Sequence, residues 1–74
     1  MEVKFIKWED EILALFPTLA ADPQGNILCY AHIGQHASAC KSLLRKGTNA
    51  TPAEYKSLLK ELQNLYKPEE IEII

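Results

Sequence analysis

The stretch CYAHIGQHASAC, residues 29–40, divides the sequence into two parts with different hydrophobic patterns. Before it, apolar and polar side chains alternate, which is typical of strands. After it, the spacing predicts a helix followed by a last strand. The stretch also contains both cysteines and both histidines of the chain. It therefore separates the predicted strands from the predicted helix, and it carries the most reactive side chains.

Before this stretch, two apolar runs predict a hairpin. Val3–Trp8 alternate with the period of a strand, and Ile12–Phe16 are apolar at every position. The polar residues between Trp8 and Ile12 predict the turn. Since its side chains are apolar on both faces, Ile12–Phe16 should form a central strand that is covered on both sides, or a strand with one face in a dimer contact.

The second strand should end at Pro17, because proline has no N–H for a sheet ladder. Residues Thr18–Asn26 then have the composition of a loop, with a turn at Asp22–Asn26. Ile27–Ile33 alternate again and predict a third strand that ends near Gly34.

On the other side of residues 29–40, the sequence predicts an amphipathic helix. Thr51-Pro52-Ala53-Glu54 has a hydroxyl at the N-cap, proline at the first helical position and glutamate three residues after the cap, which is a capping box. An apolar stripe follows on one face of this helix, which should run to about Leu65. The stripe comprises Tyr55, Leu58, Leu59, Leu62 and either Leu65 or Tyr66. A shorter helix is predicted over Ala37–Arg45, closed by Gly47.

The last residues, Glu70–Ile74, alternate as a final strand after the break at Pro68. We expect this strand to return to the sheet beside the first strand. The prediction is one α+β domain over residues 1–74, with a small, mainly antiparallel sheet in the order β-β-β-α-β and one amphipathic helix packed on one face. A domain of 74 residues has a thin margin of stability, so a partner, a dimer contact or a metal would be a natural supplement.

The charge distribution does not favour nucleic acid as the partner. The net charge is −2. Residues 1–28 have a net charge of −3 and residues 61–74 of −3, whereas residues 29–60 carry +4. Five cations spread over the middle of the chain are more typical of a solvated surface than of a nucleic-acid site. No apolar run approaches the roughly 20 residues of a membrane span. The N-terminal residues do not resemble a signal peptide, so we expect a cytoplasmic protein with reduced thiols.

Cys29, His32, His36 and Cys40 are the candidate metal ligands. Two thiolates and two imidazoles suit tetrahedral zinc. However, Cys29 and His32 would point to opposite faces of one strand. The spacing also lacks the two short pairs separated by a longer loop that are usual in zinc sites. The favoured interpretation is therefore that both cysteines are small buried residues and that both histidines bond to backbone groups. No cofactor is predicted.

A thiol enzyme is the least favoured alternative. Cys29 or Cys40 would be the nucleophile, His32 or His36 the base and Gln35 an oxyanion donor. A reactive thiol needs a lowered pKa and a pocket, which a domain of this size rarely builds.

Three blocks of the sequence, one of them within residues 29–40, carry a resemblance to a known family. The blocks are ALFP at residues 14–17, CYAHIGQH at 29–36 and ATPAEY at 50–55. In this order they resemble a family of small uncharacterised bacterial proteins found on plasmids, phages and other mobile elements. The resemblance covers most of the chain and implies an accessory protein of the bacterial cytoplasm. It implies no activity and no site residues.

From these observations we expect a non-enzymatic protein-interaction module that binds another protein or a second copy of itself. Trp8, at the end of the predicted hairpin, with Leu13 and Leu15 of the two-faced apolar strand, is the predicted contact surface. The alternatives are a small domain stabilised by zinc at Cys29, His32, His36 and Cys40, and a nucleic-acid-binding accessory protein of a mobile element.

Overall fold

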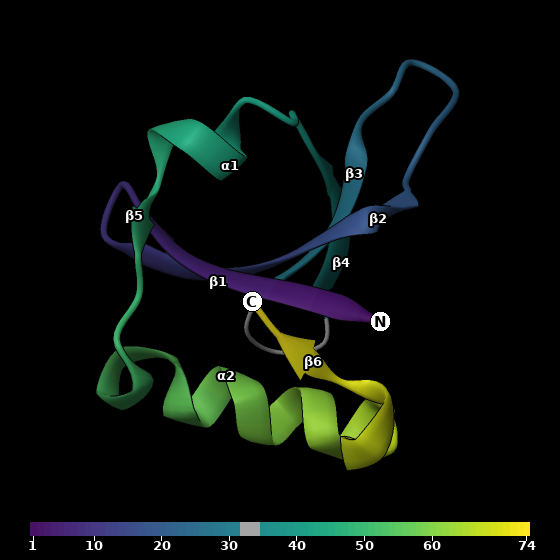
Figure 1. The fold of residues 1–74 in the computed structure, drawn as a ribbon. Coiled ribbons are helices and arrows are strands. Elements are labelled where there is room, and N and C mark those ends of the chain that lie inside the picture. Colours follow the sequence, from purple (N-terminus) through teal and green to yellow (C-terminus); the bar gives the residue numbers. More distant parts are fainter. Residues whose placement is uncertain (32–34) are drawn as a thin grey trace.

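The computed structural model describes residues 1–31 and 35–74 (Figure 1). These residues form a curved sheet with one main helix below it and a single helical turn above it. In chain order the elements are β1 (Glu2–Trp8), β2 (Glu11–Ala20), β3 (Ile27–Ala31), β4 (Gln35–Ala39), α1 (Leu43–Lys46), β5 (Thr48–Asn49), α2 (Pro52–Leu65), the 3₁₀ turn η1 (Pro68–Glu70) and β6 (Glu72–Ile73).

The described strands form one mixed sheet in the order β4-β3-β2-β1-β5, and β6 also pairs with β1. The predicted α+β class is confirmed, and so is the position of the last strand beside the first. The predicted order β-β-β-α-β is incomplete, because β4 and β5 were not expected. The sheet is antiparallel except for β6, which runs parallel to β1.

The predicted hairpin between β1 and β2 is confirmed, and its turn has two residues. Trp8 pairs with Glu11, so Glu9 and Asp10 form the loop. Both have positive φ, at 48° and 64°. Positive φ at both loop residues defines a type I′ turn, whose twist matches that of the two strands. This sequence therefore adopts the turn without the asparagine and glycine that normally favour it.

Strand β2 does not end at Pro17 but continues to Ala20, so the expected loop begins only at Ala21. The pairing of β2 with β3 shifts between Phe16, opposite Leu28, and Ala20, opposite Ile27. Pro17 lies within this β-bulge. A proline is tolerated there because the ladder is interrupted and its missing N–H is not required.

The predicted helix over Ala37–Arg45 is wrong for its first half. Residues 35–39 form β4 and pair with β3 from Ala31–Gln35 to Ile27–Ala39, and only Leu43–Lys46 are helical. The open hydrogen-bonding edge of β3 outweighs the helix propensity of the alanines. Gly47 does close α1, but with φ −73°, so no left-handed backbone is involved. Glycine fits because a Cβ there would lie 2.6 Å from Ile6 Cδ1.

Helix α2 begins with the predicted capping box. The Glu54 N–H donates to Thr51 Oγ1 at 3.3 Å, and the Thr51 N–H donates to Glu54 Oε1 at 2.9 Å. The predicted stripe faces the sheet: Leu58 and Leu62 are fully buried. Tyr66 rather than Leu65 completes the stripe, since Tyr66 packs on the core and Leu65 is 52% exposed.

The sheet has an apolar cluster on each face. The first cluster lies between the sheet and α2 and includes Phe5, Ala14 and Phe16. The second lies on the α1 side and includes Ile6, Leu15 and Cys29. Strand β2 contributes to both, which confirms that it is central and covered on both sides within one chain. The expectation of a helix on one face only is corrected by α1, whose Leu43 and Leu44 pack on the second cluster.

The strained turn between β1 and β2 yields the first prediction. Glu9→Asn combined with Asp10→Gly should raise the free energy of unfolding by about 1 kcal/mol, because both replacements adopt positive φ more readily. Urea midpoints measure this change. Gly25→Ala is the control, since Gly25 has φ 91° with open space around it, and it should lower stability. A turn variant no more stable than the parent would contradict the assignment of strain.

The capping box yields a prediction about pH. The Thr51 N–H, followed by the Lys7 side chain, lowers the pKa of Glu54 from its usual value of 4.5. A carboxyl group with a lowered folded-state pKa stabilises the fold above its unfolded pKa, and this contribution is lost as the pH falls through the folded pKa. Glu54→Gln should therefore unfold at lower urea than the parent near about pH 7, and the difference should shrink towards about pH 2.

Lys7→Met is the companion variant, because Lys7 Nζ lies 3.3 Å from Glu54 Oε2. In that background the effect of Glu54→Gln should be smaller. An effect of Glu54→Gln that does not change with pH would contradict the lowered pKa.

Candidate interaction site at the outer edge of β1

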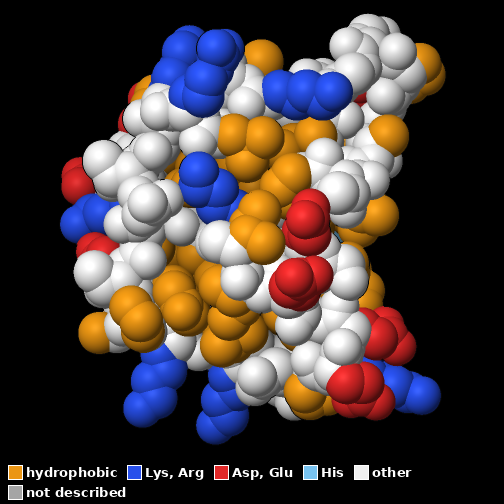
Figure 2. All heavy atoms as spheres, viewed as in Figure 1, with side chains coloured by type: hydrophobic (Ala, Val, Ile, Leu, Met, Phe, Trp, Pro, Cys, Tyr) orange, Lys and Arg blue, Asp and Glu red, His pale blue; other side chains and the backbone are white. Residues whose placement is uncertain are grey.

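The cations of the middle of the chain do not form one patch. Lys41, Arg45 and Lys46 lie on or just before α1, whereas Lys56 and Lys60 project from α2. Figure 2 shows Lys and Arg side chains near α1 and below α2, and the surface between these two places is largely apolar, with a few acidic and basic side chains. To contact the successive phosphates of a nucleic acid, a protein needs its cations on one continuous surface.

The outer edge of β1, away from β2, is covered only at its two ends. Strand β5 pairs there with Ile6 and Lys7, and β6 pairs with Glu2 and Val3. Among the described strands, none pairs with Lys4 or Phe5 on this edge. The Ala50 N–H donates to the Phe5 carbonyl at 3.1 Å, after which the chain leaves the edge to start α2. The result is a gap in the sheet edge between two strands of two residues each.

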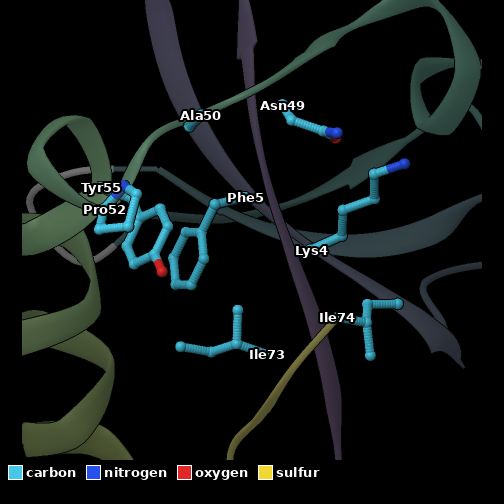
Figure 3. A pocket seen from close by; sticks show the side chains of 8 residues that line it. All are labelled: Lys4, Phe5, Asn49, Ala50, Pro52, Tyr55, Ile73 and Ile74. Carbon is cyan, nitrogen blue, oxygen red and sulfur yellow. The ribbon is translucent and has the colours of Figure 1, made fainter.

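A cavity of about 390 Å³ opens at this gap, which we call the β1 notch. Its walls come from β1, β5, β6 and the start of α2 (Figure 3). The side chains around it are those of Lys4, Phe5, Asn49, Ala50, Pro52, Tyr55, Ile73 and Ile74.

One wall of the notch is aromatic and rigid. The rings of Phe5 and Tyr55 stack with centroids 4.2 Å apart and an interplanar angle of 14°. Phe5 is held in the first cluster, and Tyr55 belongs to the first turns of α2, which the capping box fixes. Figure 3 shows Ile73 on the side of these rings and Ile74 on the side of Lys4.

The notch leaves apolar surface exposed to solvent. Ile73 and Ile74 are 44% and 56% exposed, and with Leu65 they are the large apolar side chains most exposed in the described part of the chain. The rim is polar: Lys4 Nζ donates to the Leu44 carbonyl at 3.0 Å, and Asn49 is exposed. A concave surface that combines apolar side chains with a few polar groups is typical of a binding site.

The interaction residues predicted from the sequence lie elsewhere. Trp8 and Leu13 are half-buried against the second cluster, and Leu15 is fully buried within it. Leu15 therefore presents no side-chain surface to a partner. Sequence patterns missed the β1 notch because its residues come from four separate elements. The one sequence signal was the apolar end of the chain, where Ile73 and Ile74 follow a run of acids.

The structure separates two of the candidate metal ligands. Cys29 pairs with Ala37, and Tyr30 pairs with His36. Cys29 belongs to the second cluster, whereas His36 lies on the face of Tyr30 and α2, with its Nε2 3.0 Å from Tyr66 Oη. Side chains on opposite faces of a sheet do not bind the same ion. Cys40 is exposed beyond the end of β4. His32 lies outside the described residues, and within them no three His, Cys, Asp or Glu side chains are placed to hold a metal ion.

The two thiols have opposite environments. Burial raises the pKa of Cys29. A hydrogen bond from the Ser42 side chain, followed by one from its backbone, lowers the pKa of the exposed Cys40. Cys29 and His36 lie on opposite faces of the sheet, so these two residues do not form the nucleophile and base of the thiol-enzyme alternative. The Gln35 side chain lies outside what the structure describes.

Comparison with known proteins identifies no relative: no family model, curated protein or solved structure matches this chain. The resemblance to the mobile-element family stays a prediction. In the described ranges, no helix is long and apolar enough to cross a membrane.

The two thiols should differ in their rate of alkylation. Iodoacetamide should modify Cys40 in the folded protein, while Cys29 reacts only after unfolding, because its thiol is buried and its pKa is raised. Peptide mass mapping over time measures both rates. Ser42→Ala should slow the modification of Cys40 by removing the hydrogen bond that lowers its pKa. Equal rates at the two cysteines would contradict this assignment.

Proposed function

We propose that this protein is a non-enzymatic interaction module that accepts a large apolar or aromatic side chain of a partner protein in the β1 notch. The observation that carries this proposal is the open cavity between β5 and β6, where the exposed Ile73 lies beside a rigid aromatic stack and the exposed Ile74 lies beside Lys4. The resemblance to small bacterial proteins of mobile elements supports a cytoplasmic accessory role.

The geometry favours a single inserted side chain over an added strand. The gap on β1 comprises Lys4 and Phe5, a length of roughly 7 Å at the rise of a strand. An additional strand of ordinary length would collide with β5 or β6. Burial of one large apolar side chain contributes about 1.5–3 kcal/mol, so further contacts around the rim are needed for a specific complex.

Other functions have less support in the arrangement of side chains. Zinc binding by Cys29 and His36 together is opposed by their positions on two faces of the sheet. Nucleic-acid binding is opposed by the position of the five cations of residues 29–60, which lie at two separate helices, α1 and α2. The notch is lined by groups that provide contact and hydrogen bonding, which suits recognition.

Ile74→Asp tests the proposal, with Leu65→Asp as the matched control. Both residues are about half exposed, at 56% and 52%, but only Ile74 lines the notch. Short linear peptides are first selected by display against the parent protein, and their affinities are then measured by fluorescence anisotropy. A carboxylate at residue 74 should raise Kd by about tenfold or more, because an apolar side chain of the peptide would have to desolvate it on binding, whereas Leu65→Asp should have little effect.

The selected peptides should share one large apolar or aromatic residue, and NMR shifts on binding should centre on Asn49, Ala50 and Ile73. Peptides that bind Ile74→Asp as tightly as the parent, or shifts centred elsewhere, would overturn the proposal.

A further inference from the structure

The opposite edge of the sheet is formed by β4 and is chemically unprotected. In the described part of the chain, β4 pairs with β3 only and is the outermost strand. Its residues, QHASA at 35–39, include no proline, lysine or acidic residue. Proteins usually protect a sheet edge with charges, proline, a bulge or a covering segment. An uncharged and regularly paired edge strand can add another strand.

The hydrogen-bond pattern of the sheet defines which residues of β4 point outward. On β1, the carbonyls of Val3 and Phe5 accept bonds at the outer edge. Because successive residues of a strand bond to opposite sides, Lys4 and Ile6 must bond to β2.

The same alternation can be followed across the sheet. Lys4 bonds to Leu15 of β2, so the next residue back, Ala14, bonds to Tyr30 of β3. By the same alternation, Cys29 bonds to Ala37 of β4, and the backbone groups of Ala37 therefore point towards β3. The N–H and C=O groups of His36 and Ser38 are therefore directed away from the sheet.

We propose that β4 pairs antiparallel with β4 of a second copy of this chain, about a two-fold axis at Ala37. In this register His36 of each copy lies opposite Ser38 of the other. Both residues have outward-directed backbone groups, so the two pairs form four N–H···O=C bonds. Ala37 then faces its equivalent as a non-hydrogen-bonded pair, in which the strands approach most closely and small side chains fit best.

A second copy suits this edge because β4 is complementary to itself. The axis at Ala37 pairs Gln35 with Ala39 and His36 with Ser38. No two side chains of like charge therefore lie directly opposite each other. The strand is short, and its exposed side chains at Ala37 and Ser38 are small, which favours the close approach of a second strand. The α2 faces of the two sheets form one continuous face. On it, His36 Nε2 of each copy lies 3.0 Å from Tyr66 Oη of the same copy.

The dimer would combine two sheets into one and leave both β1 notches free. The notch lies at the β1 edge, and β4 forms the other edge of the same sheet. Two copies joined at β4 therefore present two notches at the far ends of the assembly. Such a dimer would bind a partner with two apolar segments more tightly than one copy does. The pairing itself does not depend on the function of the notch.

A cysteine at the axis tests the register. In a Cys29→Ala, Cys40→Ser background, Ala37→Cys places the only thiol on the two-fold axis, where the Cα atoms of a non-hydrogen-bonded pair lie about 4.5 Å apart. This separation is within the range of a disulfide. Mild oxidation should give a disulfide-linked dimer, read by non-reducing mass spectrometry. Ser38→Cys in the same background is the control. The Cα atoms of residue 38 in the two copies would lie about 9 Å apart, so this variant should crosslink far less.

Ser38→Pro tests the pairing without a crosslink. The Ser38 N–H points away from β3, so its removal leaves the pairing of β4 with β3 intact. The parent should dimerise in native mass spectrometry and sedimentation at high micromolar concentration, and Ser38→Pro should raise the dimer Kd by about tenfold or more. Circular dichroism should show the variant folded. A parent that remains monomeric, a dimer unaffected by Ser38→Pro, or equal crosslinking at residues 37 and 38 would overturn the proposal.

Discussion

Backbone pairing along both edges of β1 is the constraint on which the rest of this structure depends. One edge of β1 bonds to β2 along five residue pairs, and the other holds β5 and β6 at its two ends. Its side chains also divide between the two faces: Val3 and Phe5 pack with α2, while Ile6 packs with α1. Because these segments are distant in the sequence, β1 joins the two ends of the chain. Loss of its register would move Phe5 and Ile6 to the wrong faces.

The notch follows from the way the chain leaves β1. Gly47 passes so close to Ile6 that no side chain fits, and the Ala50 N–H then bonds to Phe5. Thr51 is already the N-cap of α2, so β5 has no room to extend. From the other end, β6 pairs only with Glu2 and Val3. The cap that stabilises α2 therefore also leaves the edge of β1 open, and the stacked ring of Tyr55 stands at that opening.

The two edges of the sheet differ in the interaction that each can offer. At β1 the backbone is mostly paired, and the available surface is apolar side chain. At β4 the side chains are small and the backbone groups are available. Association at β1 would therefore depend on the shape of one side chain, whereas association at β4 would depend on strand register. This difference would allow both proposed surfaces to act in one small domain without competition.

The sequence alone determined the elements whose signals are local. The capping box at Thr51–Glu54 specified α2, the period of two specified β1 and β3, and the apolar run at Ile12–Phe16 specified a central strand. Tertiary pairing decided the rest: Pro17 continues β2 through a bulge, residues 35–39 become a strand against β3, and Cys29 and His36 lie on opposite faces. The β1 notch also depends on residues from four elements. Local propensity cannot predict such features, because hydrogen bonds to a distant strand provide the free energy that selects them.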